Sequence, residues 1–105
     1  MRTLNHFGIP TDIQKEGEAY LSNLKLYVTD VNNSPNKIEF LRFEADSPMP
    51  DLIKKQAHIA YVVDDIDAEM AGKPVLWPKT VMSDELTIAF IEEEGIAIEL
   101  MLCAQ

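Results

Sequence analysis

The sequence predicts an α+β fold in which one motif, a strand followed by a helix and further strands, is used twice. Apolar and polar residues alternate in short runs along most of the chain, which is the pattern of strands that bury one face. Two stretches repeat each other weakly: NHFGIPTDI at 5–13 is echoed by AHIAYVVDDI at 57–66, and IEFL at 38–41 by IELM at 98–101. A titratable residue occupies the same place in each copy, which favours a genuine repeat.

Length and composition fit one globular domain. The chain has 105 residues, of which 47% are hydrophobic and 26% are charged, a composition that can build a core and is too apolar for a disordered chain. The formal net charge is -9, and such an acidic surface argues against nucleic acid and against an anionic membrane as partners. Cys103 is the single cysteine, so an internal disulfide is excluded.

Neither a membrane span nor a secretory signal is expected. No apolar run approaches the roughly 20 residues that cross a bilayer. The N-terminal stretch MRTLNHFGIPTD lacks the apolar core and small-residue cleavage site of a signal peptide. Together with the lone cysteine, these features predict a cytoplasmic protein.

Seven strands are predicted from the alternation and from the turn residues that separate the runs. Pro10 ends the first strand, because proline cannot donate to a strand ladder. The turn NNSPN at 32–36 joins the second and third strands into a hairpin, and EEEG at 92–95 makes the last hairpin turn. The predicted strands cover residues 3–10, 25–31, 37–44, 57–63, 74–80, 86–92 and 96–103.

Two helices are predicted, one in each half. Residues 12–24 allow a short helix that Asp12 can cap, although Gly17 disfavours it. Residues 64–73, DDIDAEMAGK, carry an N-cap, acidic residues in the first turn and a glycine just past the end, so both ends of this helix are signalled. The proline-rich stretch at 46–56 is predicted to be a linker with at most one helical turn.

Both histidines and two of the glutamates share one predicted face of the sheet. Side chains alternate along a strand, so His6 groups with Leu4 and Gly8, and His58, Glu39 and Glu99 each lie opposite bulky residues suited to packing beneath a helix. The four therefore project from the face that helices do not cover, the inside of a cleft if the sheet is curved. Each residue alone is more simply explained as a half-buried or solvent-facing side chain, whereas the matching positions of all four favour a shared site.

Two imidazoles and two carboxylates in a cleft make a good site for a divalent cation. Neutral imidazole and carboxylate oxygen suit Zn, Ni, Co, Mn or Fe(II), and a cation compensates carboxylates that are otherwise costly to bury. The predicted metal ligands are His6, Glu39, His58 and Glu99.

The motifs NHFGIPT, AHIAYVVDDID, PVLWPKT and IAFIEEEGIAIEL resemble those of the vicinal oxygen chelate superfamily, also called the glyoxalase/bleomycin resistance/dioxygenase fold. The stretch IEFLRFEADSP is similar to a segment of methylmalonyl-CoA epimerases. The resemblance implies one domain over 1–105, with two βαβββ-type modules that form a curved mixed sheet around a metal-binding cleft. Module one would cover about 1–46, the linker about 47–56 and module two about 57–105.

The first module departs from the family's pattern. The chain between His6 and Glu39 is too short for the usual long helix and three strands. We therefore expect one strand and much of the first helix to be trimmed, which would also shorten one wall of the cleft.

The resemblance implies the same four ligands and assigns the catalytic base to Glu39 or Glu99. Bacterial lactoylglutathione lyases use this order of His, Glu, His and Glu, whereas extradiol dioxygenases use only the equivalents of His6, His58 and Glu99. Drug-binding members of the bleomycin-resistance type usually lack the ligands. The fourth ligand therefore favours non-redox chemistry.

The leading functional hypothesis is a glyoxalase-like, divalent-metal-dependent isomerase, lyase or epimerase that acts on a small carbonyl compound through a metal-stabilised enediolate. Three alternatives remain open: a non-catalytic small-molecule binding protein of the same fold, an extradiol-type dioxygenase, and a structural or interaction domain. The resemblance also implies a homodimer.

Overall fold

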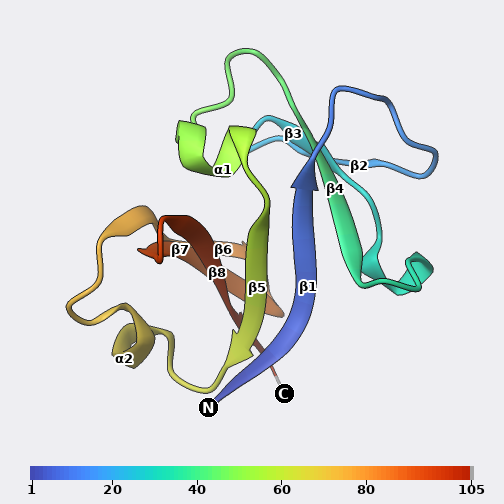
Figure 1. Ribbon diagram of the computed structural model, residues 1–105. Helices are drawn as coiled ribbons and strands as arrows, with labels where there is room; N and C mark the ends of the chain where they lie inside the picture. The colour runs from blue at the N-terminus through green and yellow to red at the C-terminus, as the bar shows by residue number, and fades with distance from the viewer. Residues whose placement is uncertain (105) are drawn as a thin grey trace.

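The computed structural model describes residues 1–104 and shows a mostly β protein with two short helices (Figure 1). Its eight described strands form one mixed sheet that curls into a half-barrel, in the order β2-β3-β4-β1-β5-β8-β7-β6. The strands are β1 (Arg2–Pro10), β2 (Ala19–Leu21), β3 (Leu26–Val28), β4 (Ile38–Phe43), β5 (His58–Val63), β6 (Val75–Ser83), β7 (Leu86–Glu93) and β8 (Ile96–Cys103). The helices are α1 (Asp51–Lys55), α2 (Ile66–Met70) and the 3-10 turn η1 (Val31–Asn33).

The internal repeat is visible in the strand register. β1 pairs with β4 in parallel, and β5 pairs with β8 in the same way. In the first pair Gly8 lies opposite Glu39, and in the second Ala60 lies opposite Glu99. Both pairs place a glutamate opposite the residue two positions after a histidine. The two halves meet where β1 and β5 pair antiparallel at the centre of the sheet (Figure 1).

The second half follows the sequence-based prediction closely. The carboxylate of Asp65 accepts from the backbone N–H of Ala68 and caps α2, as the aspartate-rich stretch indicated. Helix α2 covers the outer face of the sheet, where Ile66 packs with Val63 and with the outward-facing residues of β7 and β8. Neither α2 nor any other helix in residues 1–104 is long and apolar enough to cross a membrane.

The helix predicted over 12–24 is wrong. This stretch is irregular apart from β2, and Gly17 adopts φ +78°, outside the helical region. The guanidinium of Arg42 on β4 binds both carboxylate oxygens of Glu18, at 2.9 and 2.7 Å. This long-range ion pair holds the segment beside the sheet, so tertiary contacts outweigh a weak local preference for helix.

The expected loss of one strand in the first half is also wrong. β2, β3 and β4 follow β1 and mirror β6, β7 and β8, although β2 and β3 have only three residues each. The first half therefore differs from the second in its connection: no helix lies between β1 and β2 in the described part of the chain.

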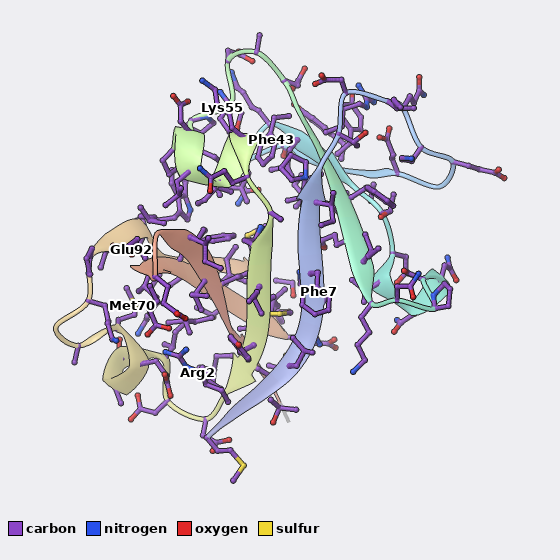
Figure 2. All side chains as sticks on the ribbon, viewed as in Figure 1. Arg2, Phe7, Phe43, Lys55, Met70 and Glu92 are labelled. Carbon is purple, nitrogen blue, oxygen red and sulfur yellow. The ribbon has the colours of Figure 1, made fainter. Side chains whose placement is uncertain are left out.

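The outer face of the first half consequently lacks a covering helix. Phe7 is 37% exposed there (Figure 2). Leu4 lies on this same outer face, not beside His6 as strict alternation predicted. A register shift pairs Leu4 with Tyr61 but His6 with Ala60, so the bulged strand turns Leu4 away from the cleft.

Apolar side chains from both halves pack together on the inner face of the half-barrel. Leu26 and Leu41 from the first half pack with Ile88 and Phe90 from the second. Ile53 of α1 is fully buried and joins the same cluster. Apolar side chains thus surround the polar residues of the inner face.

Arg2 anchors the start of β1 to the second half (Figure 2). Its guanidinium donates to both carboxylate oxygens of Glu93, at 2.8 and 2.9 Å, and to Glu69 of α2 at 2.8 Å. Lys73 lies 2.9 Å from the same Glu93 carboxylate. A bidentate, partly buried contact of this kind is stronger than an ordinary surface ion pair.

Acid is expected to weaken this anchor. The hydrogen bonds from Arg2 and Lys73 lower the pKa of Glu93 from 4.5 to about 2, so the stabilisation is complete above pH 4.5 and is lost as the pH falls towards 2. Arg2→Met should therefore lose less stability than the wild type between these two values, as measured by urea unfolding. Lys79→Met removes the same charge from an exposed pair with Asp67. Between pH 4.5 and pH 2 its free energy of unfolding should fall with the same slope as that of the wild type. Equal slopes for all three proteins would contradict the prediction.

Candidate metal centre

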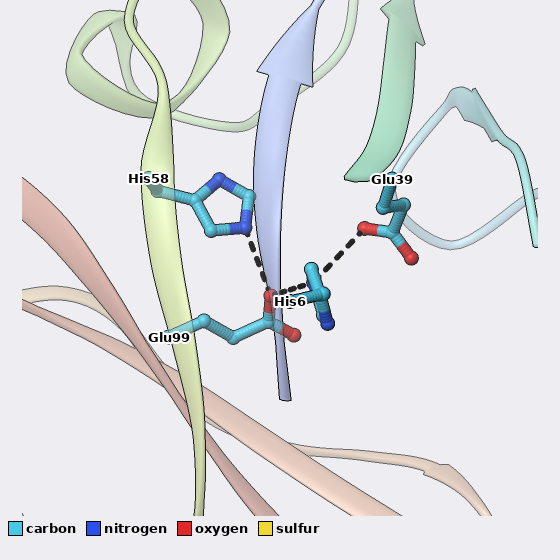
Figure 3. Close-up of side chains that lie close together, drawn as sticks. All are labelled: His6, Glu39, His58 and Glu99. Atoms are coloured by element: carbon cyan, nitrogen blue, oxygen red, sulfur yellow. Dashed lines mark hydrogen bonds and ion pairs between the residues drawn. The ribbon is translucent and has the colours of Figure 1, made fainter. Parts of the chain in front are cut away.

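The structure brings His6, Glu39, His58 and Glu99 together on the inner face of the sheet (Figure 3). They come from β1, β4, β5 and β8, the four neighbouring strands at the centre of the sheet. One ligand atom from each residue lies within 4.8 Å of the others. His6, His58 and Glu99 are buried, at 2%, 1% and 7% exposure, and Glu39 is half-buried. Their geometry fits the predicted site, while their roles as ligands stay a prediction.

Glu99 is the hub of the cluster. Its Oε1 accepts from Nε2 of His58 at 3.0 Å and lies 3.4 Å from Nε2 of His6. Oε1 of Glu39 approaches the same His6 nitrogen from the other side, also at 3.4 Å (Figure 3). The polar atoms of all four side chains therefore converge on one small volume.

The cluster attracts positive charge. Burial by itself would lower the pKa of His6, but the contacts with Glu39 and Glu99 outweigh it and raise the pKa to about 9. Burial would likewise raise the pKa of Glu99, whereas the contacts with His58 and His6 hold that pKa below its ordinary range. Opposite charges at short distance thus overcome the cost of burial on both sides.

The free nitrogen of His6 fits a cation. Nδ1 of His6 donates to Oδ1 of Asn5 at 2.7 Å, because an amide oxygen can only accept, so the neutral ring has its lone pair on Nε2. Among residues 1–104 this buried Nε2 has no hydrogen-bond partner, although carboxylate oxygens lie on two sides of it. A lone pair that faces carboxylates is repelled unless a proton or a cation lies between them. The four residues therefore fit a divalent metal ion.

Asn5 is a residue of the candidate site that the sequence reasoning missed. It sits at the register shift in β1, between Leu4 and His6, and its hydrogen bond fixes the tautomer of His6. Strict alternation of side chains gives no signal for such a bulge. The asparagine directly before the histidine was the available clue.

Gly8 is the second residue of the site that the sequence reasoning missed. It belongs to the site because it makes room for the ring of His58. A Cβ at Gly8 would lie 2.0 Å from Cε1 of His58 and 2.4 Å from its Nε2. The other side of the His58 ring meets Phe90 edge-on, with the ring centroids 5.2 Å apart. A glycine inside a strand often marks such a close approach, and this was a usable signal.

The curled mixed sheet of two repeated modules is a fold of the vicinal oxygen chelate type, and two solved structures share it. Among solved structures, a hypothetical protein from Bacillus halodurans is similar, with a TM-score of 0.70 and 19% identity over 99% of this chain and 96% of that one. Methylmalonyl-CoA epimerase from Mycobacterium tuberculosis is similar too, with a TM-score of 0.65 and 18% identity over 97% of this chain and 88% of that one. No family model and no curated protein matches the chain, and the likeness is one of fold.

Gly8→Ala is expected to weaken metal binding about 10- to 100-fold, the effect typical of losing support for a ligand. The new methyl group must displace the His58 imidazole. Isothermal titration with Zn and with Ni measures the affinity directly.

Gly72→Ala is the matched control. Gly72 has φ +74°, and a Cβ there would meet nothing within 4 Å, so alanine strains the backbone after α2 but leaves the cluster intact. The control should melt earlier and bind metal with wild-type affinity. Wild-type affinity in Gly8→Ala would show that the His58 ring is not a ligand.

Proposed function

We propose that the chain is a glyoxalase-like, divalent-metal-dependent isomerase, lyase or epimerase that acts on a small carbonyl compound. The observation that carries the proposal is the convergence of two imidazoles and two carboxylates on the inner face of the sheet. A solved structure of similar fold is named an epimerase, which supports the same direction. A small-molecule binding protein or an extradiol-type dioxygenase would be the alternatives.

His6, His58 and Glu99 are suited to holding the cation. All three are buried, and Glu99 contacts both rings. A bound divalent cation would stabilise the negative charge that develops on a carbonyl oxygen when a neighbouring proton is removed. The protein's part is to fix these three side chains in one place before the substrate arrives.

Glu39 is the better of the two glutamates for the role of base. Its side chain is 20% exposed, against 9% for Glu99, and within the cluster it contacts only His6. A carboxylate that is held on one side alone can turn towards a substrate and accept a proton. We therefore assign proton removal to Glu39 and metal binding to Glu99, together with His6 and His58.

The proposal predicts exchange of the proton next to the carbonyl group. Metal-loaded protein in D2O should incorporate deuterium into a 2-methyl-acyl thioester, or into the hemithioacetal that an α-ketoaldehyde forms with an added thiol. NMR follows the exchange with Zn, Ni, Co and Mn in turn. Glu39→Gln should slow the exchange by about 10²- to 10⁴-fold, the usual contribution of a general base. Metal content is measured for each variant, so that loss of the base is separated from loss of the ion.

Glu16→Gln makes the same chemical change at an exposed position and should exchange at the wild-type rate. Exchange at full rate in Glu39→Gln would refute its role as base. If no metal and no substrate of the panel supports exchange while small ligands still bind, the binding protein is the right alternative. Oxygen-dependent consumption of a catechol would favour the dioxygenase instead.

A further inference from the structure

A small apolar chamber opens directly onto the cluster. Its volume is about 90 Å³, and His6, Glu39 and Glu99 form part of its lining. The other eleven residues of the lining are all apolar and come from both halves of the half-barrel and from the linker. Among them Leu26, Met49 and Phe90 are 1%, 5% and 3% exposed, so part of the chamber wall is formed by the core.

Outside the cluster, the lining of the chamber within residues 1–104 has no side chain that could pair with a charged group of a ligand. No lysine or arginine is present among the described residues of its lining, and the only charges are those of the cluster itself. Burying a second carboxylate in such surroundings would be costly, because no partner compensates it. An uncharged hydrocarbon group would instead replace apolar surface that is already sheltered from water.

Size limits the hydrocarbon further. Scaled from a cavity of about 150 Å³ that binds the six carbons of benzene, 90 Å³ holds about three to four carbon groups. The chamber is therefore too small for an aromatic ring and fits a short aliphatic chain.

We propose that the chamber binds a short, uncharged aliphatic group of the substrate, of up to about three carbons, beside the carbon at which the proton is removed. This inference rests on the proposed function and adds the substrate class to it. The rest of the bound substrate extends past Glu39 into an open polar groove. Glu39 lines this groove together with Asn5, Asn32 and Lys37. Substrates with an aromatic or anionic group on the chamber side are excluded.

The five methionines of the chain provide a readout inside the protein. Met49, Met82 and Met101 line the chamber, whereas Met1 is exposed and Met70, the last residue of α2, packs on the outer face. Protein labelled with ¹³C in the methionine methyl groups therefore carries three reporters and two internal controls. Met82→Ala and Met70→Ala assign two of the signals.

The probes are alkyl hydroxamates, which chelate a divalent cation through two oxygens and project their alkyl chain next to it. With Zn-loaded protein, affinity should rise about fourfold for each methylene from acetohydroxamate to butyrohydroxamate, as expected for burial of about 0.8 kcal/mol per methylene. Affinity should then fall for hexanohydroxamate, and benzohydroxamate should bind at least about tenfold more weakly than butyrohydroxamate. Only the three chamber methionines should shift. Met82→Ala should move the optimum towards hexanohydroxamate, and Met70→Ala should not.

Two results would overturn the inference: hydroxamate binding that leaves the three chamber signals in place, or benzohydroxamate that binds as tightly as butyrohydroxamate. Xenon added to the metal-free protein tests the apolar chamber separately from the proposed function, because apolar cavities bind xenon without a metal. Xenon shifts of Met49, Met82 and Met101 in a protein that binds no zinc would uphold the apolar site and refute the metal-dependent reaction. The absence of such shifts would refute the apolar site itself.

Discussion

The antiparallel pairing of β1 with β5 is the constraint on which the rest of the structure depends. It joins the two halves into one sheet, and its register places His6 opposite Ala60 and Gly8 opposite His58. Each histidine thus faces a small residue on the neighbouring strand, so both rings can lie across the sheet and reach the same point. Because β4 and β8 pair with the outer sides of β1 and β5, the two glutamates arrive from either side.

A buried carboxylate such as Glu99 and a half-buried one such as Glu39 would normally destabilise a small core. Here the cost is offset by the imidazoles, which hold the pKa of Glu99 low, while Glu39 and Glu99 hold that of His6 high. Apolar side chains around the cluster exclude water and strengthen every charge interaction inside. The same apolar shell leaves the small chamber beside the cluster. The polar cluster at the centre and the apolar side chains around it therefore depend on each other. A divalent metal ion would balance the negative charge of the two carboxylates.

The sequence was sufficient where local geometry decides and insufficient where distant contacts decide. Strict alternation placed His6, Glu39, His58 and Glu99 on one face, because regular strands leave a side chain only two directions. It failed at Leu4, where a register shift reverses the direction. The helix over 12–24 failed because Arg42 of β4 holds Glu18 through a long-range contact and because Gly17 takes φ +78°. The helix at 64–73 was predictable because its cap and its end are local.

The two halves of the cluster are alike in origin but unlike in environment, and the difference suits a division of labour. His58 and Glu99, from the second half, are buried and joined by a hydrogen bond of 3.0 Å, with α2 packed behind their strands. Glu39, from the first half, is half-buried and borders both the chamber and the groove. This difference in burial supports the proposed roles, in which the buried pair would hold a cation and Glu39 would accept a proton. No helix lies between β1 and β2 in residues 1–104, and the more buried pair of the cluster comes from the half that has such a helix.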